Sequence, residues 1–191
     1  MEQLWFYFDL GLWHVLDATA IDHLLFIAAF TVPYHFEALR KLLWWTTLFT
    51  VGHTLSLMGN YYFALNPPSE WIEFLIPISI LVACVPLLQG SIPSPRSQAL
   101  LSLLIFVFGI IHGFGFGRYF GMIVSGEDAG SALFAFAFGV EAAQIVIILC
   151  VLLLQLLVVR FGLLTKEKWK LVAGAMILSQ ALEMTLQNWP G

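Results

Sequence analysis

The chain has 191 residues, of which 60% are hydrophobic and 10% are charged, with a formal net charge of −4 and a mean hydropathy of +0.90. A water-soluble domain usually carries about a quarter charged residues, so this composition excludes a soluble globule. The basic residues form no patch, which excludes nucleic acid as a partner. We therefore expect a polytopic membrane protein.

Six apolar segments follow one another along the chain, separated by short loops that contain Pro, Gly or charged residues. They lie at about residues 11–32, 42–62, 71–88, 99–122, 131–158 and 171–187. Each approaches the ~20 apolar residues that a transmembrane helix needs. No loop is long enough to fold separately. The predicted fold is all-α, a transmembrane helix bundle of about six spans in which residues 1–191 form a single domain.

The basic residues predict the orientation of this bundle. Seven of the eight fall in the first, third and fifth loops, and Arg118 is near the opposite face. These seven are Arg40, Lys41, Arg96, Arg160, Lys166, Lys168 and Lys170. Because positively charged loops stay in the cytoplasm, both termini are expected on the outer side. The expected location is the bacterial inner membrane, crossed several times.

Ionisable residues lie within several of these apolar segments. They are His14, Asp17, Asp22, His23, His53, His112 and Glu141. Each costs at least ~2.5–3.5 kcal/mol on insertion scales, so each marks a functional position by default. At ~1.5 Å rise per residue, five of them lie about 14–18 Å below the outer face, near the middle of the membrane. His14 and Asp17 are shallower and suit an entrance.

Helical phase limits how these groups can meet. At ~100° per residue, His14, Asp17 and Asp22 can share an inward face. His23 points nearly opposite His14 on an ideal helix. Either the helix is distorted near Thr19, or His23 meets a different neighbour. A run of glycines around His112 permits either close helix approach or an open cavity; it consists of Gly109, Gly113, Gly115 and Gly117.

The donor types in these segments favour a metal ion. Imidazole and carboxylate, without Cys or Met, suit a divalent first-row ion such as Ni²⁺, Co²⁺ or Zn²⁺. The predicted ligands are His14, Asp17, Asp22, His23, His53, His112 and Glu141, with Thr54 and Gln144 behind them. Asp17 and Asp22 are alternatively placed to orient the imidazoles. The competing interpretation is that these side chains only join helices by hydrogen bonds.

Several motifs in the same segments resemble the HupE/UreJ family of small membrane proteins. They are His14-Val-Leu, Asp22-His23-Leu-Leu-Phe, Phe49-Thr-Val-Gly-His53-Thr-Leu-Ser-Leu, His112-Gly-Phe-Gly-Phe and Phe138-Gly-Val-Glu141-Ala-Ala-Gln144. The resemblance implies a membrane protein of the type usually described as a nickel or cobalt permease. The chain departs from the family pattern at Ala137, where an Asn is common, at Ala143, where a Gly is common, and at the additional acid Asp17.

The leading functional hypothesis is therefore a metal permease or metal-binding membrane protein, with a metal ion and the lipid bilayer as its partners. An intramembrane zinc-dependent hydrolase is an alternative, in which three histidines hold the ion and Glu141 acts as general base. No HExxH motif supports it, so a non-enzymatic role is favoured. A proton relay or a structural bundle that assists a partner is the third possibility. The sequence leaves open whether the chain forms a homo-oligomer.

Overall fold

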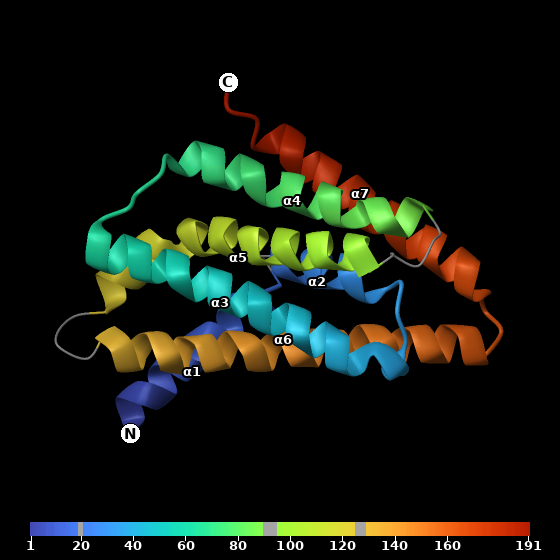
Figure 1. The fold of residues 1–191 in the computed structure, drawn as a ribbon, viewed down its shortest axis with the longest axis horizontal. Helices are drawn as coiled ribbons and strands as arrows, with labels where there is room; N and C mark the ends of the chain where they lie inside the picture. Colours follow the sequence, from blue (N-terminus) through green and yellow to red (C-terminus); the bar gives the residue numbers. More distant parts are fainter. Residues whose placement is uncertain (19–20, 90–94, 125–128) are drawn as a thin grey trace.

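The computed structural model describes residues 1–18, 21–89, 95–124 and 129–191 (Figure 1). In these ranges all regular structure is helical, which confirms the expected all-α class. The elements are α1 (Glu2–Leu16), α2 (Asp22–Thr31), the short 3-10 helix η1 (Phe36–Ala38), α3 (Leu39–Phe63), α4 (Ser69–Gln89), α5 (Pro95–Ile123), α6 (Ala129–Arg160) and α7 (Lys166–Gln187).

The first predicted segment is not one helix, and that prediction was wrong. Helix α1 begins at Glu2, nine residues before the predicted start, and ends at Leu16. Asp17 then has extended backbone angles, with φ −62° and ψ 121°, and α2 begins at Asp22. At ~1.5 Å rise per residue, α1 is about 22 Å long and α2 about 15 Å, so neither alone crosses a ~30 Å hydrocarbon core.

The other five apolar segments each coincide with one helix, from α3 to α7. Within the described residues, two helices are long and apolar enough to cross a membrane. They are Gln98–Ile123 in α5, with a mean hydropathy of 2.3, and Ala129–Arg160, with a mean hydropathy of 2.9. The expected number of six spans and the outer position of both termini stay predictions.

The turn between α6 and α7 shows how local sequence ends one helix and starts the next. Gly162 has a positive φ of 68°, a conformation that glycine adopts without steric cost. Its N–H donates to the carbonyl of Val159, and the N–H of Leu163 donates to that of Val158, which is a Schellman motif. The hydroxyl of Thr165 then accepts from the N–H of Lys168 and caps α7.

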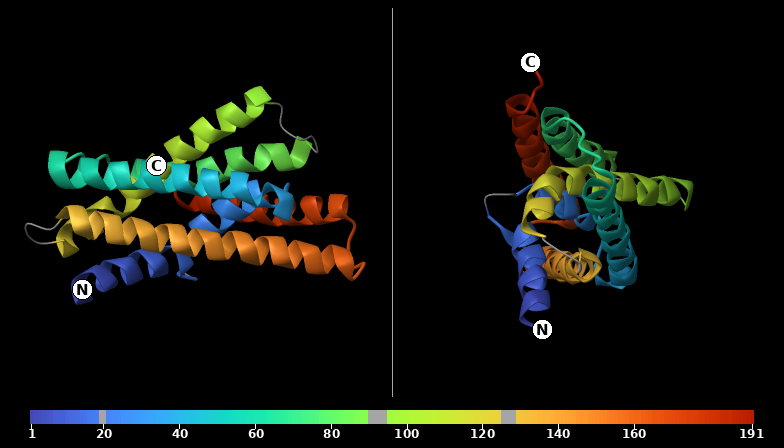
Figure 2. Two further views of the ribbon diagram at one scale, coloured as in Figure 1. Left: turned by 60° about the horizontal axis from the view of Figure 1, so that its bottom comes forward. Right: turned by 90° about the vertical axis from the view of Figure 1, so that its left-hand side faces the viewer.

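The helices pack mainly as three pairs, α3 with α5, α1 with α6, and α4 with α7. Helix α2 lies among them and contacts α4, α6 and α7 (Figures 1 and 2). Its side chains Phe26, Ile27 and Phe30 are almost fully buried. The short α2 is therefore an interior element, and its first turn lies inside the bundle.

Two of these pairs depend on glycine. A Cβ on Gly11 of α1 would overlap the backbone of Phe136, and one on Gly139 of α6 would overlap that of Phe8. In the α3–α5 pair, a Cβ on Gly52 or Gly109 would overlap a carbonyl oxygen of the other helix. A Cβ on Gly113 would likewise overlap the hydroxyl oxygen of Ser56 and the carbonyl oxygen of His53. Of the two alternatives predicted for the glycines around His112, Gly109 and Gly113 therefore show close helix approach.

This packing makes Gly109→Ala a destabilising substitution. The added methyl group meets the carbonyl oxygen of Phe49, and overpacking of this kind costs about 1–3 kcal/mol. We expect a lower thermal unfolding temperature of the detergent-purified protein. Gly130→Ala is the matched control, because nothing lies within 4 Å of its added Cβ. An unchanged unfolding temperature for Gly109→Ala would contradict the close crossing of α3 and α5.

Candidate metal centre

Three histidines from three helices converge at the break between α1 and α2. His14 lies in the last turn of α1, His23 in the first turn of α2, and His53 within α3. One ring nitrogen of each lies within 4.8 Å of the others, and this is the group of metal-type donors found among the described residues. Helix α5 brings a fourth imidazole, His112, whose ring centroid is 5.2 Å from that of His23.

The break between α1 and α2 is what allows the first two histidines to meet. On one continuous helix His14 and His23 would point almost opposite ways. In the structure their ring centroids are 4.8 Å apart. The interruption of the helix after Leu16 thus resolves the conflict of phase in the predicted segment. Thr19, near which a distortion was one of the two alternatives, lies outside the described residues.

Hydrogen bonds determine which ring nitrogen of two histidines carries the proton. The Nδ1 of His112 lies 2.8 Å from the carbonyl oxygen of Phe108, which can only accept, so this nitrogen carries the hydrogen. The Nδ1 of His23 lies 3.2 Å from a carboxylate oxygen of Asp22 and donates to it in the same way. In each neutral ring the Nε2 then has a free lone pair.

The Nε2 atoms of all four histidines are buried without any hydrogen-bond partner: His14, His23, His53 and His112. Aromatic rings surround them. Phe116 lies 4.0 Å from His14 between ring centroids, Phe136 contacts both His14 and His53, and Phe49 contacts His112. A buried polar atom without a partner costs about 1–3 kcal/mol. Four such buried nitrogen atoms gathered among aromatic rings fit a bound metal ion.

A family profile described as HupE / UreJ protein matches residues 1–188, nearly the whole chain. The chain belongs to the HupE/UreJ family. No curated protein and no solved structure matches it. Together with the two long apolar helices, family membership indicates that this is a membrane protein. The resemblance inferred from the histidine motifs is therefore confirmed.

Asp17 and Asp22, the aspartates predicted as ligands in this HupE/UreJ protein, occupy different surroundings. Asp22 binds His23 twice, through the backbone N–H at 2.9 Å and through the ring Nδ1 at 3.2 Å. It orients that imidazole, as carboxylates commonly do for metal-binding histidines. Asp17 follows α1 directly and is exposed. Neither aspartate belongs to the group formed by His14, His23 and His53.

Glu141 lies in a separate hydrogen-bonded group on the HupE/UreJ protein's α6. Its carboxyl group faces three threonines of α3 and lies 2.7 Å from the hydroxyl of Thr47 and 2.5 Å from that of Thr50. The amide oxygen of Gln144 lies 3.1 Å from the same Thr50 hydroxyl. Glu141 and Gln144 thus both contact Thr50, as expected for residues three apart on one helix face. Glu141 does not belong to the group formed by His14, His23 and His53. Thr54 is half-buried beside His53.

Sequence reasoning missed two contributors. The backbone carbonyl of Phe108 orients His112. Because every residue has a backbone carbonyl, the sequence gives no signal for this contact. The threonines Thr46, Thr47 and Thr50 surround Glu141. Their spacing of three to four residues along an apolar helix places two of them on one face, which is a signal that the sequence does contain.

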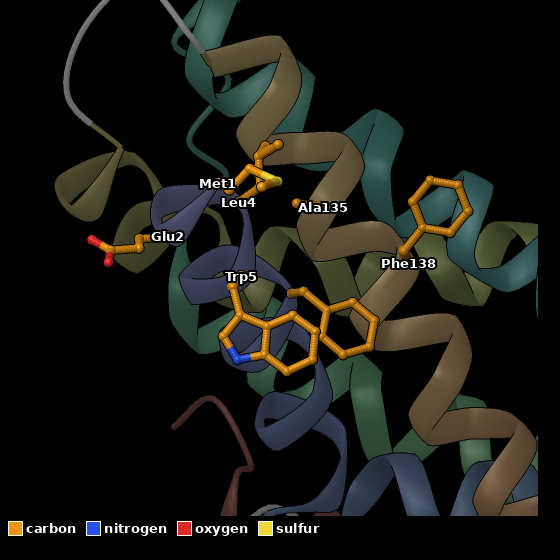
Figure 3. Close-up of a pocket in the computed structure, with 7 residues that line it drawn as sticks. Met1, Glu2, Leu4, Trp5, Ala135 and Phe138 are labelled. Atoms are coloured by element: carbon orange, nitrogen blue, oxygen red, sulfur yellow. The ribbon is translucent and has the colours of Figure 1, made fainter.

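A groove of about 740 Å³ lies elsewhere, between the start of α1 and α6 (Figure 3). Apolar side chains such as Trp5 and Phe138 line it, and Glu2 adds one carboxylate. No histidine lines this groove. In this HupE/UreJ protein it suits apolar contact rather than metal coordination.

The contact of Asp22 with His23 yields a prediction for metal affinity. Asp22→Ala removes the acceptor that orients the imidazole, and such losses typically weaken metal binding about 10–100-fold. Isothermal titration of the purified protein with Ni²⁺, Co²⁺ and Zn²⁺ measures this effect. Asp22→Asn should lose less, because its amide oxygen still accepts from Nδ1. An affinity for every ion unchanged in Asp22→Ala would contradict the orienting role, and Asp9→Ala on α1 is the control.

Proposed function

We propose that this protein binds a divalent transition-metal ion within the membrane and carries it across, as a permease of the nickel or cobalt type. The observation that carries the proposal is the set of four buried Nε2 atoms without hydrogen-bond partners, from His14, His23, His53 and His112. Neutral imidazoles suit Ni²⁺, Co²⁺ and Zn²⁺. We leave Glu141 out of this ligand set because its carboxyl group is bound to threonines.

The C-terminal end of α1 favours a cation at the site. Helix α1 ends two residues after His14, so the negative end of its dipole lies near the imidazoles. Helix α2 begins beside them, and its positive end opposes a cation. Asp22 in that first turn offsets this effect. Broken helices at the binding site are common in secondary transporters, which supports carriage in addition to binding.

The strength of binding also suits a carrier. Transport needs a site that attracts the ion and yet releases it. Imidazoles without thiolates form such a site. We propose that Asp17, which is exposed at the end of α1, receives the ion at the entrance, and that His14 passes it to His23, His53 and His112.

For the membrane topology, we propose six passes through the inner membrane by a single domain, with α1 and α2 together as the first pass. The α2–α3 and α6–α7 connections lie at one end of the molecule and the α3–α4 connection at the other (Figure 1). Arg40, Lys41, Arg160 and Lys166 flank the first two connections. The positive-inside rule then makes that end cytoplasmic and leaves both termini outside.

The proposed binding site predicts the metal content of histidine variants. His23→Ala and His112→Ala each remove one imidazole, so the purified protein should hold at least tenfold less metal, and cells should take up correspondingly less. Elemental analysis and uptake assays measure both, at equal amounts of folded protein by gel filtration. His35→Ala is the matched control, because His35 contacts Gln155 and not the cluster. Full metal content in both cluster variants would contradict the site.

Carriage and hydrolysis make different predictions for the reconstituted protein. The hydrolase needs Glu141 as a base beside the imidazoles, whereas Glu141 is bound to threonines. We expect proteoliposomes to show Ni²⁺ or Co²⁺ flux without cleavage of membrane peptides. Liposomes with His53→Ala protein are the control for leakage. Peptide cleavage without ion flux would contradict the carrier.

A further inference from the structure

Glu141 sits at the edge of a cleft between α3 and α6, apart from the three-histidine group. The cleft has a volume of about 290 Å³ and is lined by Thr47, Thr50, Phe134, Ala137, Phe138 and Glu141. Glu141 itself is half-buried. Its carboxyl group is thus accessible from one side and held by hydroxyl groups from the other.

With the amide oxygen of Gln144 turned towards Thr50, the hydrogen bonds around Glu141 need one more proton than an ionised carboxylate leaves available. The hydroxyl of Thr50 lies 2.5 Å from Oε2 of Glu141 and 3.1 Å from Oε1 of Gln144. An amide oxygen and a carboxylate can only accept, and a threonine hydroxyl has a single hydrogen. With a proton on Glu141, its O–H donates to Thr50, and Thr50 donates to Gln144. The contacts of Thr50 with Glu141 and with the amide oxygen of Gln144 are then both satisfied.

Gln144 provides a second observation. Its side chain is fully buried, and its Nε2 has no hydrogen-bond partner. If Glu141 loses its proton, Thr50 donates to the carboxylate instead, and the amide of Gln144 can turn over to donate to Thr50 through Nε2. The two protonation states of Glu141 therefore correspond to two orientations of one buried amide.

The second oxygen of Glu141 is occupied in either state. The Thr47 hydroxyl lies 2.7 Å from Oε1 and 3.0 Å from the carbonyl oxygen of Leu43, and it donates its single hydrogen to the nearer Oε1. The hydroxyl of Thr46 is 3.4 Å from the same oxygen and 2.8 Å from the carbonyl of Leu43, so its hydrogen goes to Leu43. One threonine thus stabilises the carboxyl group on each of its two oxygens.

No cation balances the charge of Glu141 in the part of the chain that the structure describes. There the ion pair within 4.0 Å joins His23 and Asp22, both of α2. Titratable groups that contact α6 are His14 of α1 and His53 of α3, at Phe136 five residues before Glu141, and His35, at Gln155. Helix α7 meets α6 far along its length, at Gln155. An unpaired charge within a membrane is costly, which favours the protonated carboxyl.

We propose that Glu141 holds an exchangeable proton between Thr47 and Thr50 and forms a proton-binding site separate from the imidazole cluster. The cleft is the path by which the proton enters and leaves. This site gives a metal carrier a proton to exchange for an ion. That use rests on the proposed function, whereas the proton site itself does not.

Dicyclohexylcarbodiimide tests the site directly, because it is hydrophobic and reacts with protonated carboxyl groups. The acid proton moves to one nitrogen of the reagent while a carboxyl oxygen bonds to its central carbon. The O-acylisourea that results rearranges to a stable N-acylurea, without any oxidant or reductant. Mass spectrometry of the full chain in lipid nanodiscs, labelled from about pH 5 to about pH 9, locates the adduct. We expect labelling at Glu141 that falls as the pH rises.

Three variants sharpen the test. Glu141→Gln should abolish the adduct, while exposed Glu73 stays at its own low level. Thr47→Val removes a donor that favours the charged form most strongly, so labelling at about pH 8 should increase relative to the wild type. Thr185→Val is the matched control, because Thr185 donates to Ala181 on α7; its labelling should not change. Absence of the adduct at every pH, labelling without pH dependence, or unchanged labelling in Thr47→Val would overturn the proposal.

The proposed metal site and the proposed proton site can be contradicted by separate results. Glu141→Gln should bind Ni²⁺ or Co²⁺ with the wild-type stoichiometry, because it leaves the imidazoles in place. Loss of metal binding in Glu141→Gln would overturn the separation of the two sites. If wild-type protein is labelled at Glu141 but binds no metal, the proposed function fails and the proton site stands.

Discussion

An imidazole nitrogen buried among aromatic rings must find a partner or destabilise the fold, and in this protein four of them lack one. His14, His23, His53 and His112 keep their Nε2 atoms free of hydrogen bonds. Two of these rings are oriented through the opposite nitrogen, His112 by the carbonyl of Phe108 and His23 by Asp22. A hydrogen-bonding role between helices would engage these atoms. Their common lack of a partner therefore supports a ligand-binding role over hydrogen bonds that merely join helices.

The helix break and the close helix packing bring these imidazoles together. The chain interrupts its first apolar segment after Leu16 and places the start of α2 inside the bundle, where His23 can face His14. Glycines then bring the remaining helices close enough for their imidazoles to meet. Gly109 and Gly113 let α5 approach the backbone of α3 beside His53, and Gly11 and Gly139 do the same for α1 and α6. Small residues are a general means of close helix packing in membranes, and here they lie next to the functional side chains.

The acidic residues are divided between two tasks. Asp22 lies against the imidazole cluster and orients one of its members. Glu141 lies against α3 about one turn before His53, where the hydroxyl groups of Thr47 and Thr50 contact its two oxygens. The same helix therefore presents His53 to one site and Thr50 to the other. A structural change in α3 that accompanied the binding of an ion would be felt at both, which is a physical basis for linking metal and proton in one small bundle.

Composition and motifs were enough to predict the all-α class, the HupE/UreJ family and the histidines that converge, because hydropathy and residue chemistry are local properties. The helix break between His14 and His23 was not predicted as a break, since the apolar pattern runs through residues 11–32 without Pro or a charge run to interrupt it. The position of Glu141 was also beyond the sequence. Counting residues predicted a depth for it similar to that of His53, but depth does not say which residues of α3 it meets. Only the packing of α6 against α3, set by contacts along both whole helices, decided that it lies among threonines.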